Sequence, residues 1–307
     1  MSMIFRYSSS PNWLKGNTHV HSTRSDGTLS PELICDLYAR AGYDFIALTD
    51  HWTAGDALLG ANDSILVMNG LELDGLDPNG AYHHIVVLGE LTGIQDTLAA
   101  SDPTDRTAAL QPLIERLDPG KTFSVWAHPH WTRNTFEDGL QFECDALEVF
   151  NSCSQVEIGR GYGMSHWDFL LKQRPNLLGV AADDAHHTPR LPSWGGGWIM
   201  VNTQHRDQES VLQALKSGEF YASSGPEFYS FAYDGRSVII ETSPVQVIRL
   251  IGPGLHGHPK VARTGEAPLR QASFDLKDCQ HPLRLEIQDF QGGIAWSNPL
   301  FILSNGS

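Results

Sequence analysis

The sequence predicts an α/β unit over residues 1–224 and a small, sandwich-like all-β unit over residues 225–307. Two observations support this prediction. Between residue 17 and about residue 220, short apolar runs alternate with stretches of helical pattern, as in repeated strand–helix units. After the Gly225-Pro226 pair, alternating or β-branched runs follow one another without a convincing helix. A chain of this length can hold one large domain and a small one, because single cores stop growing at roughly 250–300 residues.

Eight apolar runs predict the strands of the first unit. Each is short and rich in aliphatic, aromatic or β-branched residues, as buried strands are. In chain order the runs are THV at 18–20, FIAL at 45–48, ILVM at 65–68, IVVL at 85–88, FSVWA at 123–127, ALEVF at 146–150, LLGVAA at 177–182 and WIMV at 198–201.

The clearest helix follows the first of these runs. Ser30 is a good N-cap, Pro31 suits the first helical position, and Gly42 is expected to end the helix. The helical period predicts that its buried face is formed by Leu33, Ile34, Leu37 and Tyr38.

A second helix is predicted over residues 208–217, after the last strand of the unit. Gly218 offers a C-terminal cap, because glycine adopts the left-handed conformation at low cost. The apolar stripe of this helix consists of Val211, Leu212 and Leu215.

The all-β unit is predicted from six further runs. Asp234-Gly235 separates the first two, and both residues tolerate the positive φ of a tight hairpin turn. The runs are FYSFAY at 228–233, SVIIE at 237–241, VQVIRLI at 245–251, ASFDL at 272–276, LRLEIQD at 283–289 and LFIL at 300–303. No ligand-binding motif indicates a role for this unit.

Composition excludes several classes of function. The formal net charge of −15 repels a phosphate backbone, so we expect no long nucleic acid partner unless metal ions reverse the field locally. The four cysteines contain no C-x-x-C pair, which indicates reduced thiols and no thiolate zinc site. No apolar run approaches the roughly 18 residues of a membrane span, so we expect no membrane partner and a cytoplasmic location.

Metal-ligating residue types gather at the predicted strand ends. Ten of the fourteen histidines lie between residues 19 and 187. In a parallel α/β barrel, residues beyond the carboxyl ends of the strands converge on one rim. The segments concerned are His19-Val20-His21 with Asp26, Thr49-Asp50-His51, Glu72, His83-His84, His128-Pro129-His130 and Asp183-Asp184-Ala185-His186-His187.

These residues predict a cluster of divalent ions. His19 and His21 are two apart on a strand and therefore face the same side. Imidazole and carboxylate without thiolate suit zinc, manganese or iron, and the candidates outnumber the three or four protein ligands of a single catalytic ion. A carboxylate such as Glu72 can bridge two ions, which can hold a hydroxide between them.

In order and spacing, the segments resemble the polymerase and histidinol phosphatase (PHP) domain family. The resemblance covers roughly residues 15–190 and rests on the paired histidines with SDGT, and on LTDHW, LELDG, AHPH and DDAHH. The stretch ALKSGEFYASSGPEF and the ending AWSNPLFI resemble the PHP-like subgroup that includes carbaryl hydrolases. The resemblance implies a distorted seven-stranded β/α barrel that holds three divalent ions of manganese, zinc or iron.

The resemblance also implies which residues bind each ion. The first ion would take His19, His21, Glu72 and Asp184, the second Glu72, His84 and His128, and the third Asp26, His51 and His186. His84 is favoured over His83 because it immediately precedes the apolar run. Asp26 stands where many relatives have histidine, which favours harder ions such as manganese.

Further polar and aromatic residues lie beside these ligands. His130, Asp183 and His187 could orient ligands or meet the substrate. Arginines near the ligand segments could clamp a phosphate, or could form surface ion pairs: Arg133, Arg160 and Arg190. Tryptophans in the same loops could wall an apolar pocket, or could serve packing alone: Trp52, Trp131 and Trp194.

The leading functional hypothesis is a phosphoesterase that acts on a small-molecule phosphate ester. A hydroxide held by the ions would attack phosphorus, with Glu72 and Asp184 as the essential carboxylates and Arg133 or His187 assisting the leaving group. The first alternative keeps the metal site and changes the electrophile to a carbamate, ester or amide. The second is a non-catalytic binding module in which the metal cluster is structural.

Overall fold

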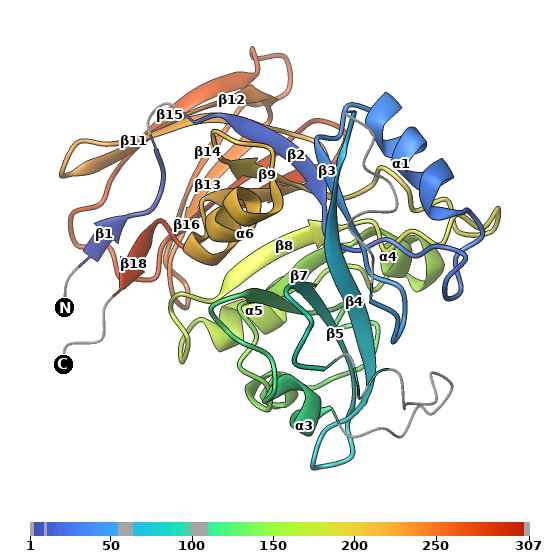
Figure 1. Ribbon diagram of the computed structural model, residues 1–307. Helices are drawn as coiled ribbons and strands as arrows, with labels where there is room; N and C mark the ends of the chain where they lie inside the picture. The colour runs from blue at the N-terminus through green and yellow to red at the C-terminus, as the bar shows by residue number, and fades with distance from the viewer. Residues whose placement is uncertain are drawn as a thin grey trace.

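The computed structural model describes residues 3–8, 11–54, 64–94, 96, 98 and 110–303. They form a mixed α/β fold in which short helices surround one large mixed sheet. The predicted α/β class is thus confirmed. Figure 1 shows β1 (Met3–Phe5) and β18 (Phe301–Leu303) side by side near the two termini, where they pair as antiparallel strands.

Seven strands follow one another in chain order across one half of the large sheet, from β2 to β8. They are β2 (Trp13–Asn17), β3 (Phe45–Leu48), β4 (Leu66–Leu76), β5 (Tyr82–Gly89), β6 (Thr122–Trp126), β7 (Ala146–Asn151) and β8 (Leu178–Ala182). Val20, just beyond β2, forms a parallel bridge with Ala185, just beyond β8. The two ends of this strand series therefore meet through the loops that carry predicted site residues.

The expected parallel pairing of strand–helix units is wrong at β4, β5 and β6. β4 pairs antiparallel with β5, and β5 pairs antiparallel with β6. Only residues 77–81 connect β4 to β5, whereas a parallel crossover needs a dozen or more residues. Asp77 fixes this turn, because its carboxylate accepts hydrogen bonds from the amides of Asn79 and Ala81.

The large sheet continues into the C-terminal part of the chain. Its order beyond β2 is β9 (Trp198–Asn202), β10 (Phe220–Ser223), β17 (Ile294–Ser297), β16 (Arg284–Gln288), β13 (Val247–Ile251) and β14 (Gly257–Val261). A separate three-stranded sheet consists of β11 (Phe228–Tyr233), β12 (Ser237–Val245) and β15 (Leu269–Asp275). Because β10 pairs with both β9 and β17, one sheet spans both predicted units, and a boundary near residue 225 stays a prediction.

Both predicted helices are present. Ser30 caps α1 (Pro31–Arg40), and Ile34 and Tyr38 are buried. The prediction that Leu33 shares the buried face is wrong: it is 56% exposed, because the buried face is formed by Pro31, Ile34, Cys35 and Tyr38 and Leu33 lies on the opposite side of the helix. In α6 (Gln208–Ser217), Val211 and Leu215 are buried and Gly218 adopts a φ of 74° at the C-cap, as predicted.

The other helical segments whose residues the structure describes throughout are short. They are α3 (Gln111–Ile114), the 3₁₀ helix η1 (Glu137–Leu140), α4 (Ser152–Ile158) and α5 (Met164–Leu170). Among the described residues, no helix is long and apolar enough to cross a membrane.

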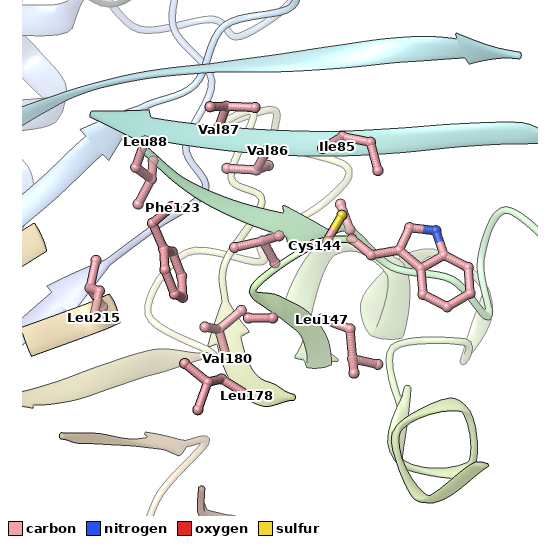
Figure 2. Packing of buried hydrophobic residues seen from close by; sticks show 14 of the residues in the cluster. Ile85, Val86, Val87, Leu88, Phe123, Cys144, Leu147, Leu178, Val180 and Leu215 are labelled. Carbon is pink, nitrogen blue, oxygen red and sulfur yellow. The ribbon is translucent and has the colours of Figure 1, made fainter. Parts of the chain in front are cut away.

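The largest hydrophobic cluster fixes the strands that carry the site. Figure 2 shows Val86 and Val87 of β5, Phe123 of β6, Val180 of β8 and Leu215 of α6 in this cluster. All five are buried, so β5 and β6 in the middle of the series share one core with β8 at its end. A well-packed core of this kind holds its side chains in single rotamers and limits movement of the strands. A second cluster lies between the three-stranded sheet and strands β13 and β16.

Candidate metal centre

The structure brings the nine predicted metal ligands together in one cluster. Most of them lie in the loops that follow β2, β3, β6 and β8, where parallel strands end. Glu72 differs from its expected place after a strand, because β4 continues through it to Leu76. The cluster consists of His19, His21, Asp26, His51, Glu72, His84, His128, Asp184 and His186.

The Glu72 carboxylate lies at the centre of the cluster and is 1% exposed. Ring nitrogen atoms of five histidines face its two oxygen atoms at 2.7–3.4 Å: His19, His21, His51, His84 and His128. The first three face Oε2, and the last two face Oε1. Such a division between two oxygen atoms is the arrangement expected of a carboxylate that bridges two ions.

Two aspartates complete the acidic side of the cluster. Asp184 Oδ1 lies 3.1 Å from His21 Nε2 and 3.4 Å from His19 Nε2. Asp26 Oδ2 lies 3.3 Å from His186 Nε2 and 3.8 Å from His51 Nε2. The Asp26 side chain is 50% exposed, whereas that of Asp184 is 9% exposed, so the cluster opens to solvent at Asp26.

Four overlapping sets of side chains have ligand atoms within 4.8 Å of one another. The sets are His21, Asp26, His51 and His186; His19, His21 and Glu72; His19, His128 and Asp184; and His51, Glu72 and His84. Each set has the imidazole and carboxylate donors that suit a zinc, manganese or iron ion. Because the sets share residues, neighbouring ions would be bridged.

The structure distinguishes His84 from His83. His84 Nδ1 lies 2.7 Å from Glu72 Oε1 inside the cluster. His83 points elsewhere: its Nε2 lies 3.3 Å from Asp77, and its Nδ1 accepts a hydrogen bond from Trp126. This geometry favours His84 as the ligand candidate.

Several buried residues that support the ligands were not found from the sequence. Glu148 of β7 accepts hydrogen bonds from His19 Nδ1 at 2.8 Å and from the His128 amide at 2.9 Å. Asp74 accepts hydrogen bonds from His51 Nδ1 and from the indole of Trp52. Their signal in the sequence is a carboxylate within a buried strand, which needs a partner to be tolerated there.

Electrostatic coupling within the cluster is strong. Burial raises the pKa of Glu72, but the facing imidazoles of His19, His51 and His84 outweigh burial and hold that pKa well below its usual range. Burial lowers the pKa of His186, but its contacts with Asp26, Cys153 and Asp184 together outweigh burial and raise the pKa to about 10. Both shifts show that the cluster stabilises positive charge among its carboxylates.

Backbone strain concentrates in the site loops. Trp52, His128, Asp184 and His187 adopt φ values of 53°, 26°, 50° and 56°, in the left-handed region that residues with a Cβ atom rarely occupy. Strain of this kind persists only where surrounding contacts impose it, and it is common at functional sites.

A cavity of about 340 Å³ opens beside the cluster. Seven of the nine ligand candidates line it: Asp26, His51, Glu72, His84, His128, Asp184 and His186. Arg133, which is exposed, and His187 are not among the lining residues, so the structure does not place these two candidates at the cavity. Trp131 lines the cavity, whereas Trp52 is buried against Asp74.

Asp183 has a structural position next to the cluster. Its buried carboxylate accepts hydrogen bonds from the amides of Gly195, Gly196 and Gly197 and from the hydroxyl of Tyr38. Burial raises its pKa to about 6 despite these donors. Asp183 therefore ties the glycine-rich loop and α1 to the segment that carries Asp184 and His186.

The fold of this chain is similar to that of known proteins. No family model matches the chain. A two-domain protein from Bacteroides vulgatus that contains a predicted PHP-like metal-dependent phosphoesterase has a similar structure, with a TM-score of 0.50 and 16% sequence identity. The similarity covers 98% of this chain and 91% of that chain. The chain has a PHP-like fold.

Two further proteins are similar to this PHP-like chain. A DNA polymerase/3'-5' exonuclease PolX of Bacillus subtilis is 23% identical over 227 residues, which are 66% of this chain and 39% of that protein. The chain thus spans about two fifths of the length of the curated relative it matches. The structure of a putative metal-dependent phosphoesterase from Bifidobacterium adolescentis has a TM-score of 0.40 and 15% identity, over 58% of this chain and 91% of that chain.

Proposed function

We propose that the chain is a metal-dependent hydrolase of the PHP family, and specifically a phosphoesterase with three divalent ions of manganese, zinc or iron. The observation that carries this proposal is the convergence of five imidazoles on the buried carboxylate of Glu72. We also propose that β2 to β8 form the distorted seven-stranded barrel, which the bridge between Val20 and Ala185 supports.

The donor set fits divalent ions. His19 Nε2 and His21 Nε2 lie 3.1 Å apart and face the same oxygen atom of Glu72, although both imidazoles are fully buried. Two ring nitrogen atoms and a carboxylate oxygen that point at one position are donors that a shared cation would take. The Nδ1 atoms of His21 and His128 are also buried without a hydrogen bond partner.

The residues of the cluster have distinct parts in the proposed reaction. Bound ions would lower the pKa of a coordinated water and neutralise charge on the phosphoryl oxygens. Glu148 holds His19 with Nδ1 protonated, which leaves Nε2 free to face the cluster. Asn151 donates hydrogen bonds to Glu148 and Asp184 and so fixes both carboxylates. Since Arg133 and His187 do not line the cavity, we assign neither a role at the leaving group.

A parallel assay tests the proposal. Manganese-loaded protein is assayed with phenyl phosphate and with a phenyl carbamate, because the same metal site could serve a carbonyl electrophile. Hydrolysis of the phosphate, abolished in Glu72→Gln, is the expected result. Glu209→Gln, at an exposed position of α6, is the matched control and should retain activity. Turnover of the carbamate alone would refute phosphoesterase activity, and unchanged activity in Glu72→Gln would refute the proposed site.

A further inference from the structure

One part of the cavity wall is aromatic. Trp131 and Tyr82 lie on the lining beside His84, with ring centroids 5.8 Å and 5.1 Å from its imidazole. The Trp131 ring also lies 5.1 Å from that of His128, in an edge-to-face arrangement. Leu191 adds an aliphatic side chain to the lining. An apolar wall therefore begins directly beside two imidazoles of the cluster.

Hydrogen bonds from the polar groups of both aromatic side chains hold the two rings in place. The Trp131 indole donates a hydrogen bond of 2.6 Å to Glu157 of α4. The Tyr82 hydroxyl donates a hydrogen bond of 2.5 Å to Asp74, which also supports His51. Rings that are already fixed lose little conformational entropy when a flat ligand packs against them.

Outside the metal cluster, the only charged side chain that lines the cavity among the described residues is acidic. Among the described residues, the lining includes no lysine and no arginine. Its carboxylates are Asp26, Glu72, Asp184 and Glu157, and only Glu157 lies outside the metal cluster. A phosphate at the cluster would be neutralised by the ions, but a second anionic group on the same ligand would meet Glu157 without a cationic partner.

From this wall we infer that the substrate is a phosphate monoester whose leaving group is aromatic and carries no negative charge. The inference rests on the proposed phosphoesterase function. Hydrolysis would break the bond between phosphorus and the aryl oxygen; water would supply a hydroxyl to phosphorus and a proton to the phenolate. A cavity of about 340 Å³ is at the small end of the range for ligand pockets, so it suits a phosphate with about one ring system.

Three phosphate esters and two phosphonates test the inference. Phenyl phosphate, 4-carboxyphenyl phosphate and ethyl phosphate are assayed with metal-loaded protein for kcat and KM. Binding of phenylphosphonate and 4-carboxyphenylphosphonate, which cannot be hydrolysed, is measured by calorimetry. We expect kcat/KM for phenyl phosphate to exceed that for 4-carboxyphenyl phosphate by about tenfold. We also expect phenylphosphonate to bind more tightly than 4-carboxyphenylphosphonate, with the lower Kd.

Variants of Trp131 and Glu157 test whether these side chains cause the preference for uncharged aryl esters. Trp131→Ala should raise KM for phenyl phosphate by about tenfold and change KM for ethyl phosphate much less, because only the aryl ester packs against the indole. Glu157→Gln keeps an acceptor for the indole but removes the charge. It should therefore reduce the ratio of kcat/KM for phenyl phosphate to kcat/KM for 4-carboxyphenyl phosphate by about two- to fivefold. Trp194→Ala, at an exposed position outside the cavity lining, is the control.

The outcomes separate the inference from the proposed function. If no ester is hydrolysed and no phosphonate binds, the proposed function fails. If the esters are hydrolysed but Trp131→Ala leaves the ratio of KM for phenyl phosphate to KM for ethyl phosphate as in wild type, the inference fails and the proposed function stands. The inference also fails if the carboxylate on the ring changes neither kcat/KM nor Kd. Elemental analysis of each variant shows whether the metal content has changed.

Discussion

Replacement of Glu148 by glutamine tests whether this buried carboxylate holds the cluster together. Glu148 is 1% exposed and accepts three hydrogen bonds, from His19 Nδ1, the His128 amide and Asn151 Nδ2, at 2.7–2.9 Å. Alanine would leave three buried donors unpaired at about 1–3 kcal/mol each, which rivals the whole stability of a typical domain. Glutamine keeps the volume and is therefore the informative change.

A glutamine at this position cannot satisfy both sides. If its oxygen faces His19, its amide group opposes the donors of His128 and Asn151. If its oxygen faces those donors, its amide donates to His19 Nδ1 and moves the imidazole proton to Nε2, the atom that faces Glu72. The first orientation destabilises the fold, and the second blocks a ligand atom.

We expect Glu148→Gln to weaken metal binding by about 10- to 100-fold, as changes to residues that orient ligands typically do. Loss of a hydrogen bond to a charged group should also lower stability by about 1.5–3 kcal/mol. Competition with a chromophoric chelator measures metal affinity, and thermal unfolding followed by circular dichroism measures stability. Glu143→Gln, at an exposed position just before β7, is the control. A metal affinity within twofold of wild type and an unchanged Tm would refute the assigned role of Glu148.

Three further predictions follow from packing and exposure. Leu215→Ala should cost about 2–5 kcal/mol in chemical denaturation, since Leu215 is fully buried, whereas Leu33→Ala should cost under about 0.5 kcal/mol; equal costs would contradict the assigned burial. Gly16→Ala should destabilise by about 1–3 kcal/mol or more, because the new Cβ would overlap the ring of Phe45, and an unchanged Tm would exclude this packing. Asp26→Asn should remove about one ion per chain in elemental analysis, because Asp26 belongs to one candidate set only; full metal content would argue against that set.

Most apolar runs predicted strand positions well, but the THV run at 18–20 is wrong as a strand, because β2 ends at Asn17 and the run lies in the buried loop that follows it. β3 coincides with the FIAL run at Phe45–Leu48. β4 was harder to predict, because the ILVM run stops at residue 68 while the strand continues to Leu76. Glu72 and Asp74 are two residues apart and lie on the same face of β4, where Glu72 faces the metal cluster and Asp74 supports the ligand candidate His51. The site thus places polar residues inside the strand. The apolar pattern therefore ends where the strand begins to carry site residues.

The ligand candidates could be predicted because they follow strand ends, and strand ends converge. The supporting residues were missed because Glu148 and Asp74 lie within strands and not beyond strand ends, so their one signal is a carboxylate inside a buried strand. Pairwise geometry decides such roles: His83 and His84 are equivalent by residue type, yet the alternation of side chains along β5 sends only His84 toward Glu72. Arg133 and His187 were chosen for proximity in sequence, and positive φ values of 62° and 56° accompany their placement outside the cavity lining.

The electrostatics of the cluster link ion binding to protons. Burial lowers the pKa of His19, but Asp184, Glu72 and Glu148 outweigh it and hold the pKa well above its usual range; the pKa of His186 is raised to about 10. Without ions, these imidazoles are therefore protonated at neutral pH, and the imidazolium charges balance the buried carboxylates. A divalent ion binds only the deprotonated ring nitrogen, so its binding must displace those protons. Because the groups keep their protons until the pH passes their raised pKa values, we expect ion affinity at the set that contains His186 to increase with pH above neutral. Protons and metal ions are thus alternative sources of the positive charge that the carboxylates around His19, His21 and His186 require.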